Sequence, residues 1–323
     1  MDYLSDLNPA QREAVTAPPG PILVLAGPGS GKTRVLTRRI AYRVDHLGAT
    51  PDAIMAVTFT NKAAREMMSR LEDIQGSEQT KRSSLHNLNI GTFHSLCARI
   101  LRREAEALPF THDFVIFDEA DQRSLLRQIF KELNLDPKQV QPRRVHDAIS
   151  RAKNELMEIE SLVAESYSQE IIHRVFERYQ QLLLANNALD FDDLLQYVVT
   201  LLEGDLNIRA RYQARFQHIL VDEFQDTNTA QYRLLRLLAG DQPDLFVVGD
   251  PDQSIYRWRG ADYRNVRRFQ EDYPGAQTIL LEQNYRSTQT ILDVAMAVID
   301  RNTGRQKKEL FTERGVGERV VLH

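Results

Sequence analysis

The segment AGPGSGKT at 26–33 follows an apolar run and contains the residue types that bind phosphate groups. Its glycines allow backbone N–H groups to turn inward around phosphate oxygens, and a helix starting there adds partial positive charge. Lys32 would reach the β- and γ-phosphates of a nucleotide, and the Thr33 hydroxyl would bind Mg²⁺. The usual pattern begins with glycine, whereas this chain has the small residue Ala26, which still permits the turn. The expected phosphate-binding residues are Gly27, Gly29, Ser30, Gly31, Lys32 and Thr33.

Two adjacent carboxylates follow a second apolar run, HILV at 218–221. Asp222 would hold Mg²⁺ through water, because Mg²⁺ dehydrates reluctantly. Glu223, one residue later, is placed to orient and deprotonate an attacking water. Paired acids after an apolar run also begin many helices, so this assignment depends on the P-loop. The combination predicts hydrolysis of a nucleoside triphosphate with Mg²⁺ and disfavours a nucleotide kinase, which would protect its phosphoryl group from water.

Short apolar runs alternate with helical periodicity on both sides of a helical segment. Strands are expected at 21–26, 54–59, 89–92, 218–221, 245–248 and 278–281. Helices are expected at 31–47, from 61, up to 107, at 229–239 and from 287. Strands that alternate with helices imply βαβ units, so the predicted fold class is α/β with a parallel sheet. The stretch GERVVLH at 317–323 is expected to form a further strand.

The segment between about 109 and 204 has a different pattern, with long amphipathic stretches at 119–133, 143–155 and 168–186. Residues 114–117 are its only fair strand candidate. We therefore expect a helical insertion subdomain here. The acids of Asp190–Asp193 could suggest a metal site, but acids at the start of a helix complement its dipole, and we prefer that interpretation.

Composition excludes several classes of protein but does not identify one. The single cysteine, Cys97, excludes an intramolecular disulfide and a four-cysteine metal site, so a cytoplasmic location fits best. No apolar stretch is long enough for a membrane span, and the first residues do not resemble a secretory signal. The net charge of -4 does not indicate a nucleic-acid binder. Basic clusters at 34–43, 99–103 and 257–268 are either solvated helix faces or local phosphate-binding stripes.

Three aromatic residues, Phe59, Tyr256 and Trp258, follow strand-like runs and have polar or cationic neighbours. Proteins that bind single strands stack bases on aromatic rings and hold the backbone with cations. The only tryptophan of a chain is more often a core residue. Here Trp258 lies between two arginines, and such charged neighbours argue against a core position.

Seven segments occur in a fixed order. They are LNPAQREAV, AGPGSGKT, AVTFTNKAAREM, GTFHSLCARIL, VDEFQDTN, VVGDPDQSIYRWRGAD and LEQNYRST. Together they resemble the motifs of the UvrD/Rep/PcrA-type superfamily 1A DNA helicases, over residues 4 to about 300. The resemblance implies a RecA-like P-loop NTPase domain that couples ATP hydrolysis to 3′→5′ movement on DNA in repair or replication.

The resemblance also implies roles for single residues at the nucleotide. Gln11 would read the adenine, with Arg34 and Tyr285 on the faces of the base. Gln253 would sense the γ-phosphate and couple it to DNA. Arg286 would cross the cleft between two motor domains to the γ-phosphate, where a guanidinium stabilises developing charge.

DNA contacts form a second implied group. His94 could instead be a structural residue that caps its helix, and the contact by Phe191 follows from the resemblance alone. The candidate DNA-binding residues are Thr58, Phe59, Asn61, Thr92, His94, Phe191, Tyr256, Trp258 and Arg259.

The implied organisation is a first RecA-like motor domain at 1–108 and 205–283, the insertion at 109–204, and the beginning of a second RecA-like domain at 284–323. The family's later motifs would follow residue 323, so we expect this chain alone to bind Mg·ATP weakly, to hydrolyse it slowly if at all, and not to unwind a duplex. The expected partners are single-stranded DNA, its junctions with duplex, and repair or replication proteins, with no membrane. Two alternatives stay open: the helicase part of a helicase–nuclease, and a non-catalytic DNA-binding module switched by ATP.

Overall fold

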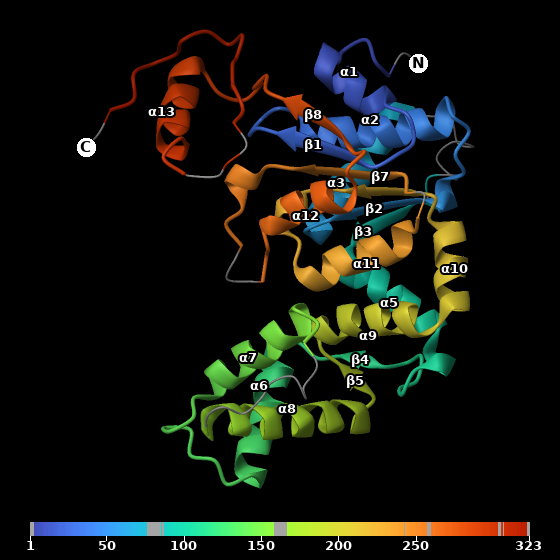
Figure 1. The fold of residues 1–323 in the computed structure, drawn as a ribbon, viewed down its shortest axis with the longest axis vertical. Helices are drawn as coiled ribbons and strands as arrows, with labels where there is room; N and C mark the ends of the chain where they lie inside the picture. Colours follow the sequence, from blue (N-terminus) through green and yellow to red (C-terminus); the bar gives the residue numbers. More distant parts are fainter. Residues whose placement is uncertain are drawn as a thin grey trace. The chain divides into compact units, whose positions relative to one another are not determined.

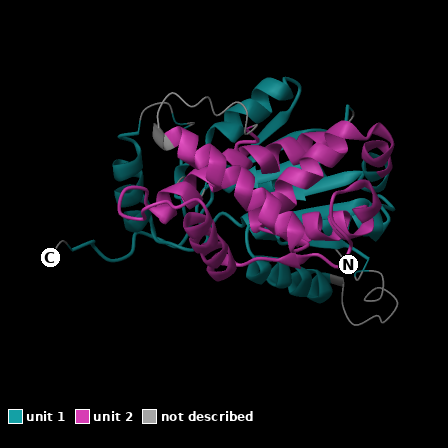
Figure 2. Cartoon of the chain, turned by 90° about the horizontal axis from the view of Figure 1, so that it is seen from below, with its two compact units in different colours: residues 1–92, 212–227, 239–323 teal, residues 93–211, 228–238 magenta. Residues whose placement is uncertain are grey.

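The chain divides into two compact units, coloured separately in Figure 2. Unit 1 comprises residues 1–92, 212–227 and 239–323, and unit 2 comprises 93–211 and 228–238. The computed structural model describes residues 3–75, 85, 87–157, 167–241, 243–256, 260–302, 305 and 307–321. The division predicted from the sequence is one into motor domains and an insertion, which a division into compact units does not test. It stays a prediction for the segments 1–108, 109–204, 205–283 and 284–323.

Unit 1 is built on a six-stranded parallel sheet of order β3-β2-β6-β7-β1-β8 (Figure 1). Its strands are β1 Ile22–Ala26, β2 Ile54–Thr58, β3 Asn89–Thr92, β6 His218–Val221, β7 Leu245–Gly249 and β8 Gln277–Leu281. The predicted α/β class and parallel sheet are confirmed. Since parallel strands end at the same edge, the loops after β1, β6, β7 and β8 lie at one edge of the sheet.

Helices cover this sheet because its central strands are apolar at nearly every position. All five residues of β1 are buried, and its alternate residues from Ile22 pack in a core with α1, α2 and α3. The helices of unit 1 are α1 Pro9–Thr16, α2 Lys32–Asp45, α3 Asn61–Gln75, α12 Arg264–Asp272 and α13 Gln289–Ile299. Single 3-10 turns are η1 Pro51–Ala53, η4 Phe224–Asp226 and η5 Pro251–Gln253.

A buried charge cluster holds the beginning of β7. The Asp244 carboxylate lies 3.2 Å from Arg43 and 3.6 Å from Arg39, whose side chains are almost fully buried. His218 Nδ1 lies 2.6 Å from the same carboxylate. Burial raises the pKa of Asp244, but the hydrogen bond with His218 and the charges of the two arginines outweigh it, so the pKa lies below the ordinary value.

Unit 2 is mainly helical and has its own apolar core. Helix α5 packs against α9, which explains why the residues after β3 belong to unit 2. Its helices are α5 Phe93–Arg103, α6 Glu119–Glu132, α7 Pro142–Asn154, α8 Tyr167–Ala185, α9 Phe191–Gly204 and most of α10 Leu206–Arg215 and α11 Thr229–Ala239, with the turn η2 Ala105–Ala107. Of these helices, α6, α7, α8 and α9 lie in the segment 109–204, where helices were predicted; the boundaries of the insertion stay a prediction.

Two details of the predicted secondary structure are wrong. Residues 317–321 of the expected terminal strand pair with no strand among the described residues, because β-structure needs a neighbouring strand as well as apolar residues; 322 and 323 lie outside the description. The ladder of unit 2 pairs β4 Val115–Ile116 with β5 Ala188–Leu189, and the second of these strands was not predicted. Across the described residues, every helix is too short or too polar to cross a membrane.

Candidate nucleotide and nucleic-acid sites

The P-loop turns between β1 and α2 through two glycines in the left-handed region. Gly29 has φ of 65° and Gly31 has φ of 89°, values that glycine adopts at little cost. A Cβ atom at Gly31 would lie 2.9 Å from Gln11 Nε2, and one at Gly29 would lie 2.7 Å from Arg286 Cβ. The glycines therefore provide both the turn and the space for the residues packed on the loop.

Four consecutive carbonyl oxygens of this loop accept hydrogen bonds. The donors are Ser30 Oγ to Gly27 at 2.7 Å, Asn284 Nδ2 to Pro28, Tyr285 N–H to Gly29 at 2.9 Å, and Gln11 Nε2 to Ser30 at 2.8 Å. By contrast, no acceptor among the described residues receives the N–H groups of Gly29, Gly31 and Lys32. The loop thus turns its carbonyls into the protein and leaves these amides for an anion.

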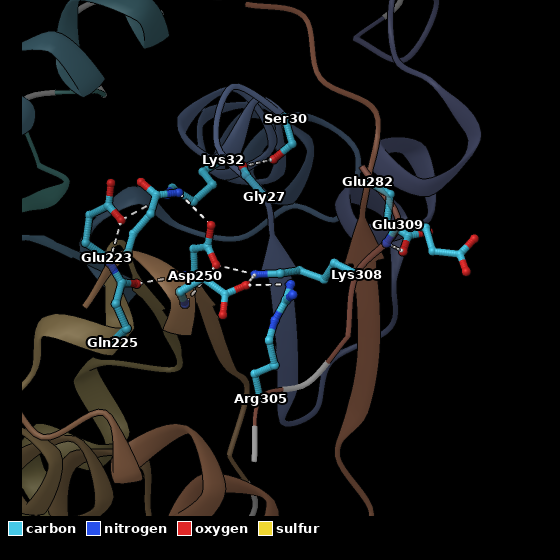
Figure 3. A network of polar contacts seen from close by, with 12 residues as sticks. Gly27, Ser30, Lys32, Glu223, Gln225, Asp250, Glu282, Arg305, Lys308 and Glu309 are labelled. Carbon is cyan, nitrogen blue, oxygen red and sulfur yellow. Dashed lines mark hydrogen bonds and ion pairs between the residues drawn. The ribbon is translucent and has the colours of Figure 1, made fainter. Parts of the chain in front are cut away.

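The candidate base lies opposite the P-loop lysine. Lys32 Nζ is 3.1 Å from Glu223 Oε2, so the helix after β1 and the loop after β6 present opposite charges to each other (Figure 3). Glu223 has φ of 50° and ψ of 45°, a left-handed conformation that costs a non-glycine residue about 1–2 kcal/mol. Strain of this kind is concentrated at functional sites, and here it accompanies the contact with Lys32.

Thr33 and Asp222 supply the oxygen donors that Mg²⁺ prefers. Asp222 follows β6, and its amide donates to the carbonyl of Val57 at 2.9 Å. Burial, and then the charge of Glu223, raise the pKa of Asp222 to about 7. A divalent cation beside this buried carboxyl would favour its charged form, so the donor set fits Mg²⁺ held together with nucleotide oxygens and water.

Gln253 and Arg286 reach the same edge of the sheet from different loops. Gln253 lies in η5, and its Nε2 donates to Asp250 Oδ2 at 2.6 Å. Arg286 is exposed, and its backbone N–H donates to Asn284 Oδ1 at 2.8 Å. A Cβ atom added at Gly29 would lie only 2.7 Å from the Cβ atom of Arg286, so this arginine lies beside the P-loop.

Gln11 has a structural position that the sequence interpretation missed. It is fully buried; its Oε1 accepts the N–H of Asn8 at 3.2 Å, and its Nε2 donates to Ser30. Together with Asn8 Oδ1, which accepts the N–H of Gln11, this is a capping box that starts α1. The sequence contained an indication of this capping box, because Asn8 is followed three residues later by Gln11 at the start of a helix. Adenine recognition by Gln11 remains a prediction.

The two residues expected beside the adenine lie near Gln11. The Tyr285 side chain is 40% exposed, and its hydroxyl accepts from Asn8 Nδ2 at 2.9 Å. Arg34 forms an ion pair with Asp6. The loop after β8 thus presents an exposed ring and the start of α2 a guanidinium beside the P-loop, as base stacking would require.

Two candidate DNA-binding rings of unit 1 contact each other. Phe59 and Tyr256 stack with ring centroids 4.9 Å apart and an interplanar angle of 28°. Asn61 is exposed at the first position of α3, whereas the hydroxyl of the buried Thr58 donates to the carbonyl of Thr60. Thr92 ends β3 and is half-buried. Trp258 and Arg259 lie outside the described residues.

The two candidate DNA-binding residues of unit 2 also form a pair. The His94 and Phe191 rings form a T-shaped contact with centroids 5.7 Å apart, and Phe191 is 45% exposed. Burial lowers the pKa of His94, which favours the neutral imidazole. The pair presents an aromatic surface at the starts of α5 and α9.

The acids around Phe191 begin α9, as the dipole interpretation predicted. Asp190 is the N-cap and forms a capping box with Asp193. Both carboxylates pair with the fully buried Lys153 Nζ, at 2.6 and 2.7 Å. No group of three His, Cys, Asp or Glu side chains suited to a metal ion occurs in the described part of the chain. Sequence reasoning missed Lys153, since one lysine in a polar helix gives no indication of burial.

A P-loop at the edge of a parallel sheet, with a carboxylate opposite its lysine, defines a P-loop NTPase. The model of the UvrD/REP helicase N-terminal domain matches residues 7–274, so the chain belongs to this helicase family. The resemblance seen in the sequence is confirmed.

Curated relatives align with nearly the whole chain. ATP-dependent DNA helicase PcrA of Bacillus subtilis (strain 168) is 50% identical over 322 residues, which are 99% of this chain and 43% of that protein. PcrA of Leuconostoc citreum is 46% identical over 319 residues, covering 98% of this chain and 42% of the relative. PcrA of Staphylococcus aureus (strain Mu50 / ATCC 700699) is 46% identical with coverages of 98% and 43%. The chain therefore spans less than half the length of these relatives.

Proposed function

We propose that this chain is the N-terminal, ATP-binding portion of a cytoplasmic ATP-dependent DNA helicase that moves 3′→5′ along one strand during repair or replication. The observation that carries the proposal is the pairing of Lys32 with Glu223 at 3.1 Å beside a P-loop in which the amides of Gly29, Gly31 and Lys32 have no acceptor among the described residues. It supports hydrolysis of the γ-phosphate bond. The order of the motifs supports coupling to DNA and the direction of movement.

In the proposed reaction the N–H groups of Gly29 and Gly31 hold phosphate oxygens, and Lys32 exchanges Glu223 for the phosphates. Mg²⁺, held by Thr33 and Asp222, would supply positive charge to the phosphate oxygens. Glu223, released from Lys32, accepts the proton of the attacking water, a contribution worth about 100- to 10,000-fold in rate. These groups follow the ends of β1 and β6, two strands of the unit 1 sheet that have β7 between them.

Single-stranded DNA is the proposed partner, together with its junctions with duplex DNA. The stacked pair of Phe59 and Tyr256 and the exposed Phe191 offer flat apolar surfaces to unpaired bases. Stacking on such rings contributes about 1–3 kcal/mol per base without sequence preference. This property suits a motor that must pass over any sequence.

DNA-dependent phosphate release tests the proposal. In the complete protein that contains this chain, we expect single-stranded DNA to stimulate ATP hydrolysis, and a duplex with a 3′ tail to be unwound in preference to one with a 5′ tail. ATP binding with no DNA-stimulated hydrolysis would instead identify an ATP-switched binding module. Preference for the 5′ tail would refute the proposed direction.

The isolated chain provides a second test of the same proposal. We expect it to bind Mg·ATP weakly, to hydrolyse it slowly if at all, and to leave duplex DNA intact. The reason is that the family's catalytic cleft takes groups from two motor domains. Strand separation by this chain, with contaminating helicase excluded, would contradict that account.

A further inference from the structure

Gln225 lies between the candidate base and the neighbouring strand end, and no role has been assigned to it above. Its side chain is buried in η4, two residues beyond Glu223. Gln225 Nε2 donates to Glu223 Oε2 at 2.9 Å, and Gln225 Oε1 accepts the backbone N–H of Asp250 at 2.9 Å (Figure 3). One amide group therefore joins the end of β6 to the end of β7.

The hydrogen bonds select one oxygen of the Glu223 carboxylate. Oε2 accepts from Gln225 and lies 3.1 Å from Lys32 Nζ, whereas Oε1 has no partner among the described residues. A carboxylate fixed through one oxygen keeps its other oxygen, and that oxygen's lone pairs, in a defined direction. General-base catalysis needs such a direction, because the base must lie within hydrogen-bond reach of the water it deprotonates.

The β7 end that holds Gln225 also holds the predicted γ-phosphate sensor. Asp250 Oδ2 accepts from Gln253 Nε2 at 2.6 Å, and the other oxygen of Asp250 pairs with the buried Lys308. Asp250 is itself fully buried. The base and the sensor thus share one anchor, with Gln225 on its backbone and Gln253 on its carboxylate.

The space around Gln225 restricts its amide to this position. A Cβ atom at Gly249, the last residue of β7, would lie 2.6 Å from Gln225 Oε1 and 3.2 Å from its backbone nitrogen. The absence of a side chain at Gly249 lets the loop after β6 approach β7 this closely. An amide that donates on one side and accepts on the other fits there, whereas a carboxylate could not donate to Glu223.

We propose that Gln225 is a positioning residue for ATP hydrolysis: it orients the Glu223 carboxylate and links that orientation to the strand end that carries Gln253. This inference rests on the proposed hydrolytic function. Displacement of Gln253 by a γ-phosphate would move Asp250, and through Gln225 it would move the base.

The test replaces Gln225 with methionine in the complete protein. Methionine has similar length and stays compatible with burial, but it cannot make these two hydrogen bonds or the longer one that Nε2 donates to Asp226 Oδ2 at 3.3 Å. We expect the maximal rate of DNA-stimulated ATP hydrolysis to fall about tenfold to a hundredfold, the range that misplacement of a catalytic group causes, with the KM for ATP little changed. Gln231→Met is the matched control: Gln231 is also buried, but it caps α11 through the backbone N–H of Asn228.

A positioning role predicts non-additive effects. In a Glu223→Gln background, which lacks the base, Gln225→Met should lower the residual rate by less than about twofold. A purely structural role predicts instead a further fall there, with a weaker affinity for ATP. An unchanged rate in Gln225→Met on its own, or a loss equal to that of Gln231→Met, would overturn the proposal.

Crystal structures of the two variants give a readout that does not need turnover. The Glu223 carboxylate should change its orientation in Gln225→Met and keep it in Gln231→Met; an unchanged orientation in Gln225→Met would overturn the assignment. If the unsubstituted protein hydrolyses no ATP with DNA present, the proposed function is wrong, and these structures alone decide the role of Gln225.

Discussion

The contact between Lys32 and Glu223 leads to an unusual expectation for Glu223→Gln: ATP binding should tighten while turnover is lost. Lys32 has to leave Glu223 before it can hold phosphate, so the ion pair competes with the nucleotide. Glutamine keeps the shape of the side chain and an oxygen that can accept from Lys32. It removes the charge that holds the lysine and that repels the phosphates.

The size of this effect follows from the exposure of the pair. The side chains are 11% and 35% exposed, so the pair lies between a buried ion pair and a surface one. Exposed pairs contribute about 0.2–1 kcal/mol, and hydrogen bonds to charged groups about 1.5–3 kcal/mol. Solvent screening at Glu223 and the remaining amide oxygen reduce the loss to about 1 kcal/mol, which is about fivefold in Kd.

Equilibrium titration with a fluorescent ATP analogue and Mg²⁺ measures this change, and phosphate release measures turnover. We expect Glu223→Gln to lower the Kd about fivefold and the rate by about 100-fold or more. Lys32→Ala should raise the Kd, and Glu313→Gln, the same charge change at an exposed acid, should alter neither quantity. Equal loss of affinity in Glu223→Gln and Lys32→Ala would refute the assigned roles, as would normal turnover in Glu223→Gln.

Three further predictions concern buried charges and backbone strain. Asp244→Asn should lower the melting temperature at neutral pH, because Arg39 loses a buried counter-charge. The pKa of Asp244 lies below its ordinary 3.8, so this stabilisation is present above that pH and disappears as the pH falls. Melting curves of the two proteins should therefore converge in acid. Lys153→Met should lower the free energy of unfolding by about 3–5 kcal/mol, because it leaves two carboxylates buried without their cation; a loss below about 1 kcal/mol in urea unfolding would contradict this. Gly31→Ala should weaken ATP binding in the same titration, since alanine at φ of 89° is strained and its Cβ would displace Gln11; wild-type affinity would show that the loop tolerates a side chain.

The local features of this protein follow from the sequence because they depend on neighbouring residues. Consecutive apolar residues predict the strands β1 and β6, which are buried at nearly every position. Glycines at fixed spacing predict the P-loop, and acids before an apolar helix predict the cap at Asp190. The terminal strand was wrongly predicted for the complementary reason: apolar residues permit a strand, but only a neighbouring strand makes one.

The tertiary structure alone decided which side chains meet. The sequence lists strands in order, but the sheet order β6-β7-β1 is what brings Glu223, Gln225 and Lys32 to one edge. The stacking of Phe59 on Tyr256 and the burial of Lys153 likewise join residues distant in the chain. Such contacts depend on the folding of several segments at once, and no local pattern encodes them. The sequence by itself therefore determined that the chain has a P-loop, a candidate base and the motifs of its family. The fold decided that Lys32 and Glu223 restrain each other, and that Gln225 holds the base against the strand that carries Gln253.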